Sequence, residues 1–92
     1  MNAAETAQLN RRRAILAALL VAPSQMLVVP ALREQVFMTG YQASLAQMRA
    51  DCDWLADVGL VEYQNDVAIL TDAGSDVVLG HTVFPGIKRG GA

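Results

Sequence analysis

The chain has little of the chemistry that metal sites, disulfides and active sites require. Its 92 residues include one cysteine, Cys52, and one histidine, His81. A single cysteine cannot form an intrachain disulfide, and one cysteine with one histidine cannot supply the ligands of a structural zinc site. The sequence places no nucleophile beside a base and has no glycine-rich loop for phosphate. It therefore predicts a protein that is not an enzyme and that carries neither a metal nor a cofactor.

Positive charge and long apolar runs are also scarce. Seven lysines and arginines stand against nine aspartates and glutamates, which gives a net charge of −2. This balance excludes a polycationic nucleic-acid coat, although the distribution of charge matters more for DNA binding than its sum. Arg11–Arg13 interrupt the apolar residues before Val21, so this segment is too short for a membrane span and lacks the order of a secretory signal. We expect a cytoplasmic protein without a membrane segment.

Apolar content, in contrast, is high for a chain of this size. Hydrophobic residues make up 53% of the sequence, whereas a small domain buries only about 60% of its unfolded surface. Some apolar surface therefore remains to be covered after folding. Because the two-fold dimer is the commonest assembly of such domains, we expect a homodimer.

The stretch from Gln42 to Leu60 is predicted to be the central helix of the domain. Its apolar residues recur at the spacing of one narrow helical stripe: Leu45, Met48, Cys52 and Leu55. Ser44 is a suitable N-cap, and Gly59 follows Val58 as a left-handed C-terminal cap requires. A helix of about 14 residues, roughly 20 Å long, fits a DNA major groove.

The opposite side of this helix is apolar as well, through Ala43, Ala46, Ala50 and Trp54. A helix with two apolar faces is sandwiched in its own domain or meets a partner, so these residues are the predicted partner interface. Arg49 is the single cation here, against Asp51, Asp53 and Asp57. We interpret the three aspartates as an acidic, solvated face.

The flanking segments predict a mostly α fold with a small β-hairpin (α+β), arranged as a winged helix-turn-helix. Residues 1–6 are expected to be a disordered N-terminus, residues 7–80 the domain, and residues 81–92 a C-terminal tail. The expected elements are a helix ending near Ala22, a short strand at Met26–Val29, a helix at Pro30–Met38, the central helix, strands at Leu60–Tyr63 and Val67–Leu70, and a helix from Thr71 to Gly80. Asn65-Asp66 suits a two-residue turn of positive φ between the strands.

Two motifs follow one another in the second half of the chain: Trp54-Leu55-x-x-x-Gly59-Leu60-Val61 and Leu70-Thr71-x-x-Gly74. They resemble the end of the recognition helix, the wing and the last helix of arsenic-repressor-like and multiple-antibiotic-resistance-like regulators. Together with Asp51, Asp76-Val77 and the run Val83–Arg89, residues 11–89 more narrowly resemble small winged-helix proteins of Mu-like prophages. The tail departs from the usual form by an extra Phe84. The resemblance implies a winged-helix fold in a bacterial host, and it carries over no metal site.

Two functions follow as hypotheses. The first is a dimeric transcriptional regulator that binds duplex DNA, with Gln42, Ser44 and Gln47 facing base edges because glutamine bonds adenine bidentately. The cations expected on phosphate are Arg11, Arg12, Arg13, Arg33, Arg49, Lys88 and Arg89; for Arg11–Arg13 an ordinary solvated helix start is the alternative. The second is a winged-helix module for protein–protein contact in phage development or assembly, acting through Ala43, Ala46, Ala50 and Trp54.

Overall fold

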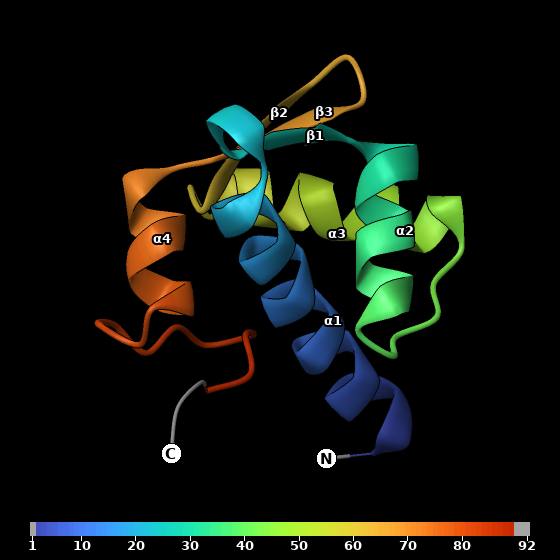
Figure 1. Cartoon of the computed structure of the whole chain (residues 1–92). Helices are drawn as coiled ribbons and strands as arrows, with labels where there is room; N and C mark the ends of the chain where they lie inside the picture. The colour runs from blue at the N-terminus through green and yellow to red at the C-terminus, as the bar shows by residue number, and fades with distance from the viewer. Residues whose placement is uncertain (1, 90–92) are drawn as a thin grey trace.

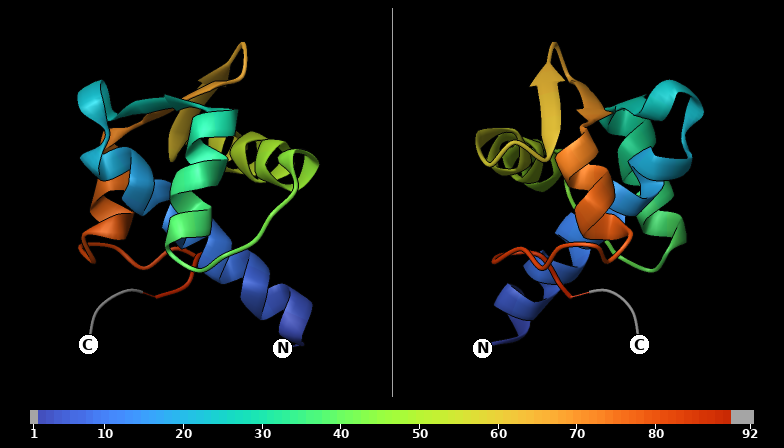
Figure 2. Two further views of the ribbon diagram at one scale, coloured as in Figure 1. Left: turned by 45° about the vertical axis from the view of Figure 1, so that its right-hand side comes forward. Right: turned by 90° about the vertical axis from the view of Figure 1, so that its left-hand side faces the viewer.

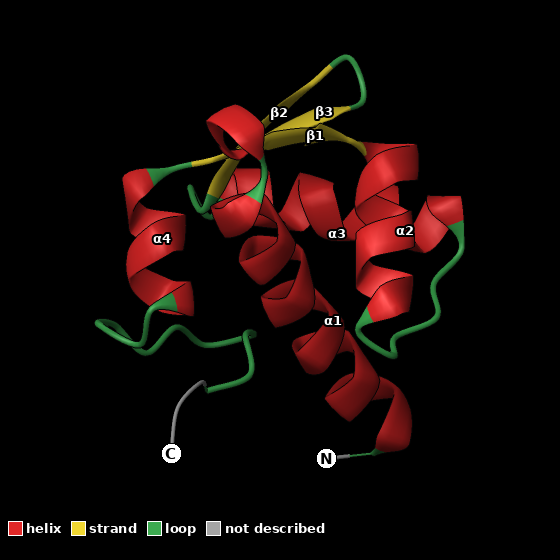
Figure 3. Ribbon diagram, in the orientation of Figure 1, coloured by secondary structure: helices red, strands yellow, loops and turns green. Residues whose placement is uncertain are grey.

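The computed structural model describes residues 2–89; Met1 and residues 90–92, the end of the predicted tail, lie outside the described part. The protein is α+β, with α-helices and a three-stranded antiparallel sheet, so the predicted composition is confirmed (Figures 1 and 3). The elements are α1 Ala3–Val21, a 3₁₀ turn Pro23–Gln25, β1 Met26–Val28, α2 Val29–Met38, α3 Leu45–Asp57, β2 Val61–Gln64, β3 Val67–Leu70 and α4 Asp72–Val78.

The sheet has the strand order β1-β3-β2, and both pairings are antiparallel. Asn65 and Asp66 join β2 to β3 with φ angles of 53° and 61°, the left-handed conformation that a tight hairpin turn of matching twist requires. The short strand expected at Met26–Val29 is present as β1, and it pairs with the hairpin, since Met26 lies opposite Ile69 of β3. The tip of the hairpin projects from the body of the molecule (Figure 2).

α1 crosses the molecule between α2 and α4, with α3 behind it and the sheet at one end (Figure 1). It begins at Ala3, inside the segment predicted to be disordered, because the Asn2 side chain caps it by accepting a 2.8 Å hydrogen bond from the Glu5 N–H. It packs mainly against α2, α4 and β3. The side chains without exposed surface include Ile15, Leu16, Leu19, Leu32, Val36, Met48, Leu55 and Ala68.

α3 begins and ends where the sequence predicts. Ser44 Oγ accepts from the Gln47 N–H at 3.0 Å, and Gln47 Oε1 accepts from the Ser44 N–H at 2.9 Å. This reciprocal capping box satisfies two donors that the first helical turn leaves free. The helix stops before Gly59, whose φ is +81°. Met48, Cys52 and Leu55 of the predicted stripe are fully buried, which fixes the opposite side of α3 toward solvent.

Candidate nucleic-acid interface

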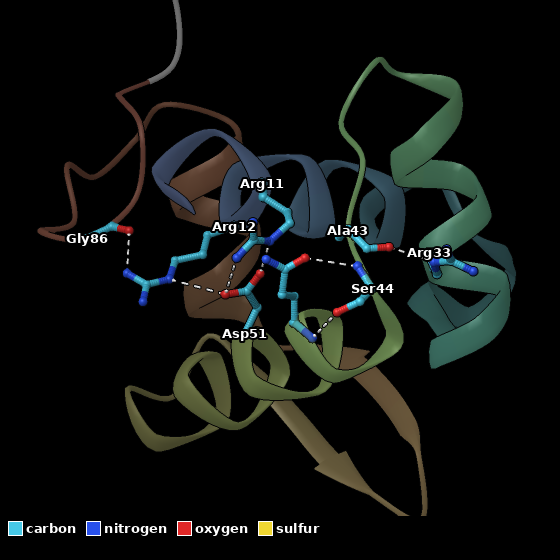
Figure 4. Close-up of polar contacts among 8 residues, drawn as sticks. Arg11, Arg12, Arg33, Ala43, Ser44, Asp51 and Gly86 are labelled. Carbon is cyan, nitrogen blue, oxygen red and sulfur yellow. Dashed lines mark hydrogen bonds and ion pairs between the residues drawn. The ribbon is translucent and has the colours of Figure 1, made fainter. Parts of the chain in front are cut away.

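The residues predicted to face base edges lie together at the N-terminal end of α3. Gln42, Ser44 and Gln47 are exposed and line an open hollow of about 720 Å³ with Arg33 and Phe37 of α2. Arg33 holds this end in place, because its Nε donates a 2.7 Å hydrogen bond to the Ala43 carbonyl (Figure 4). The hollow therefore joins the two helices through the turn between them.

The capping box limits what two of these side chains can do. Ser44 Oγ and Gln47 Oε1 both accept hydrogen bonds from the backbone. Gln47 keeps its amide N–H groups as donors, but it cannot also accept from adenine in the bidentate manner unless the box opens. Gln42 lies before the box and is exposed, so it is the glutamine that the geometry leaves free for bidentate recognition.

Arg49 of α3 forms an ion pair with Asp66 of the hairpin. Its Nε and Nη2 donate to the two carboxylate oxygens of Asp66 at 3.0 and 2.9 Å, and the Tyr63 hydroxyl donates to Asp66 Oδ1 at 2.9 Å. The hydrogen bond from Arg49 is the main reason that the pKa of Asp66 is lowered. The side chains of Arg49 and Asp66 remain 46% and 35% exposed, so a competing anion has access to the guanidinium.

Arg11 does not face solvent, contrary to the expectation that it contacts phosphate. Its Nε donates to Asp51 Oδ2 and its Nη2 to Oδ1 at 3.3 Å, while Arg12 Nε lies 3.8 Å from Oδ1 (Figure 4). The Asp51 side chain is only 2% exposed, so its interpretation as part of a solvated acidic face is wrong. The two arginines neutralise a carboxylate that would otherwise be buried without a partner.

Arg12 and Trp54 hold the C-terminal tail. The Arg12 guanidinium lies 3.9 Å from the centroid of the Trp54 ring, and its Nη1 donates a 3.0 Å hydrogen bond to the Gly86 carbonyl. Phe84 meets the same ring edge-on at 6.1 Å. Within the predicted partner interface, Trp54 is therefore half-covered by the chain itself and Ala43 is half-buried, whereas Ala46 and Ala50 are exposed.

Arg13, Lys88 and Arg89 gather on a different side of α1, where they line one groove. Successive helical residues point about 100° apart, so Arg11 and Arg13 cannot share a direction, and this spacing is a signal that the sequence contains. Lys88 is held close by the 3.2 Å hydrogen bond from its N–H to the Leu9 carbonyl. Of the seven residues predicted to contact phosphate, two are turned inward, namely Arg11 and Arg12. A third, Arg49, is paired with Asp66.

The chain matches no protein-family model, no curated protein and no solved structure. Across residues 2–89, no group of three or more His, Cys, Asp or Glu side chains is arranged to hold a metal ion. No helix in the same range is long and apolar enough to cross a membrane.

Replacing the buried carboxylate is expected to destabilise the fold. Asp51→Ala leaves Arg11 with an uncompensated buried charge, which costs about 3 kcal/mol of unfolding free energy. Asp53→Ala is the matched control, since Asp53 is exposed on the same helix and its loss changes stability by less than about 0.5 kcal/mol. Urea unfolding measures both. Equal midpoints for the two variants would contradict the role given to Asp51.

The hydrogen-bonded cluster of Arg49, Asp66 and Tyr63 also predicts that stability depends on pH. Burial, followed by the hydrogen bond to Asp66, raises the pKa of Tyr63 to about 12. Because the folded-state pKa lies above the ordinary value of about 10, the stability contributed by the neutral phenol is complete below pH 10 and is lost as the pH rises through 12. Absorbance at about 295 nm should show a late-titrating tyrosine that disappears in Tyr63→Phe. A late component that persists in this variant would refute the assignment.

Proposed function

We propose that this chain is a winged helix-turn-helix protein that binds duplex DNA through the N-terminal end of α3. In this arrangement α2 and α3 form the helix-turn-helix and the β2–β3 hairpin is the wing. The single observation that supports it best is the exposed hollow in which Gln42 and Gln47 lie beside Arg33. Glutamines for bases, an arginine for phosphate and the positive end of a helix dipole meet there.

Few cations are available to this surface, and that sets the strength of binding. Arg33 adjoins the hollow, and Arg49 joins it when a phosphate replaces Asp66. Exposed ion pairs contribute little to stability, so this exchange is inexpensive. Each phosphate contact adds about −0.9 to the slope of log K against log salt. Two contacts give a slope of about −2, which describes a weak binder with a shallow salt dependence.

The proposal includes a two-fold dimer that regulates transcription in the cytoplasm of a bacterial host. The exposed apolar surface supports the dimer, because Val21 is 82% exposed and Met38 is 76% exposed. Such residues lose unfavourable contact with water when a second copy covers them. A two-fold dimer reads two half-sites about one helical turn apart.

Removing the ion pair between Arg49 and Asp66 is expected to strengthen DNA binding. Asp66→Asn frees Arg49 and removes a negative charge from the hairpin, so the Kd for a mixed-sequence duplex at about 0.1 M salt should fall roughly threefold to tenfold. The salt slope should stay near about −2, because the same two phosphate contacts form in both proteins. Fluorescence anisotropy with a labelled duplex of roughly 20 base pairs, about two helical turns, measures both quantities.

The matched control is Asp76→Asn, which changes net charge equally on α4, where Asp76 lies 3.4 Å from His81. Its effect on Kd should stay below about twofold at about 0.1 M salt, because exposed charges farther from the DNA than one Debye length, roughly 10 Å, are screened. Equal effects of the two variants would show that only net charge matters and would contradict a DNA contact at Arg49. Absence of binding by the parent and Asp66→Asn at tens of micromolar, where non-specific contact appears, would remove the proposal.

A second function, protein–protein contact, is favoured by the remainder of the α3 outer face. Ala46, Ala50, Asp53 and Asp57 are exposed there, and the only arginine of α3 is paired with Asp66. Small apolar residues flanked by acids suit contact with another protein surface better than contact with phosphate. This function gains support if DNA binding is absent and if Ala50→Arg abolishes self-association in sedimentation while its circular dichroism spectrum matches that of the parent.

A further inference from the structure

The groove on the far side of α1 combines an apolar floor with positive charge. Its volume is about 500 Å³, within the range of small-molecule sites. Alanines of α1 form the floor, and the end of α2 and the turn after it form the opposite wall. The residues that matter here are Arg13, Ala17, Ala18, Tyr41, Lys88 and Arg89.

The fold holds the charged residues of this groove from two directions. Arg13 projects from α1, while Lys88 and Arg89 arrive with the tail, which is anchored by the buried Ile87. No aspartate or glutamate lines the groove among the described residues. Arg13 Nε is buried and has no hydrogen-bond acceptor within residues 2–89. Three cations with no carboxylate among the described lining residues therefore give this groove the local positive charge that attracts an anion.

The apolar lining of the groove indicates what kind of group would accompany the anionic group of a ligand. Alanine side chains leave a flat apolar floor because they are short, and Tyr41 adds an aromatic wall. A bare phosphate ion would satisfy the cations but would leave this surface in contact with water. A ligand with a planar apolar body and one anionic group satisfies both parts of the site.

We propose that this groove binds a small amphiphilic anion, namely an aromatic carboxylate whose carboxylate lies on Arg13 and whose ring lies on Ala17 and Ala18. Lys88 and Arg89 lie beside the carboxylate of the bound ligand. The proposal does not depend on DNA binding, because none of these side chains lines the hollow at the start of α3.

Titration of the full chain with 2-naphthoate, followed by amide chemical shifts in NMR, tests the proposal. We expect saturable shifts confined to residues 10–21, 35–41 and 87–89, with a Kd of roughly 0.1–1 mM for a ligand of this size. The neutral 2-naphthamide should bind at least about tenfold more weakly, since it lacks the charge-assisted hydrogen bonds. Equal binding of acid and amide would overturn the assignment of the anionic end.

Two pairs of variants separate the site from non-specific binding. Arg13→Gln should raise the Kd by about fivefold or more, and Arg13→Lys should restore most of the affinity, because charge pairing with the carboxylate dominates. Ala17→Leu fills the floor and should abolish binding, whereas Ala73→Leu, on the exposed surface of α4, should not. Unchanged Kd values in both Arg13→Gln and Ala17→Leu would refute the site. Equal shifts at the same amides with inorganic phosphate would show a plain phosphate surface instead.

Discussion

The buried carboxylate of Asp51 is the constraint on which the rest of this structure depends. Removing an ion from water costs several kcal/mol unless partners compensate for it, and here Arg11 and Arg12 reach across from α1 to do so. Arg12 also lies over Trp54 and bonds the Gly86 carbonyl. One charge cluster therefore connects the first helix, the central helix and the C-terminal tail.

This cluster decides which cations remain for other molecules. With two arginines committed to Asp51 and Arg49 paired with Asp66, the accessible positive side chains divide between two places. Arg33 of α2 lies beside the start of α3, while Arg13, Lys88 and Arg89 line the groove on α1. The chain has a net charge of −2, so any binding to anions must come from this local arrangement. The two proposed sites follow from that division.

The local features of the fold could be predicted from the sequence, whereas contacts between side chains far apart in the chain could not. Ser44 and Gly59 bound α3, and Asn65-Asp66 make the hairpin turn, because each acts on backbone within a few residues. Arg11 and Asp51 are 40 positions apart, and no local rule pairs them. The same limit applies to Trp54, which helical spacing places on an outer face but which the tail half-covers. For these residues the sequence indicates only that Arg11 and Arg13 point in different directions from the same helix.

The most direct test of this account is a double-mutant cycle between Arg11 and Asp51, using Arg11→Met and Asp51→Leu and the unfolding free energy in urea. If the buried pair ties α1 to α3, Arg11→Met leaves Asp51 with Arg12 alone, and Asp51→Leu leaves both arginines without their carboxylate. The double variant leaves only Arg12 without it, and Arg12 keeps its contacts with Trp54 and Gly86. The account predicts a coupling of about 2 kcal/mol, with the double variant more stable than the sum of the single effects implies. Additivity within about 0.5 kcal/mol, the behaviour of independent sites, would contradict it.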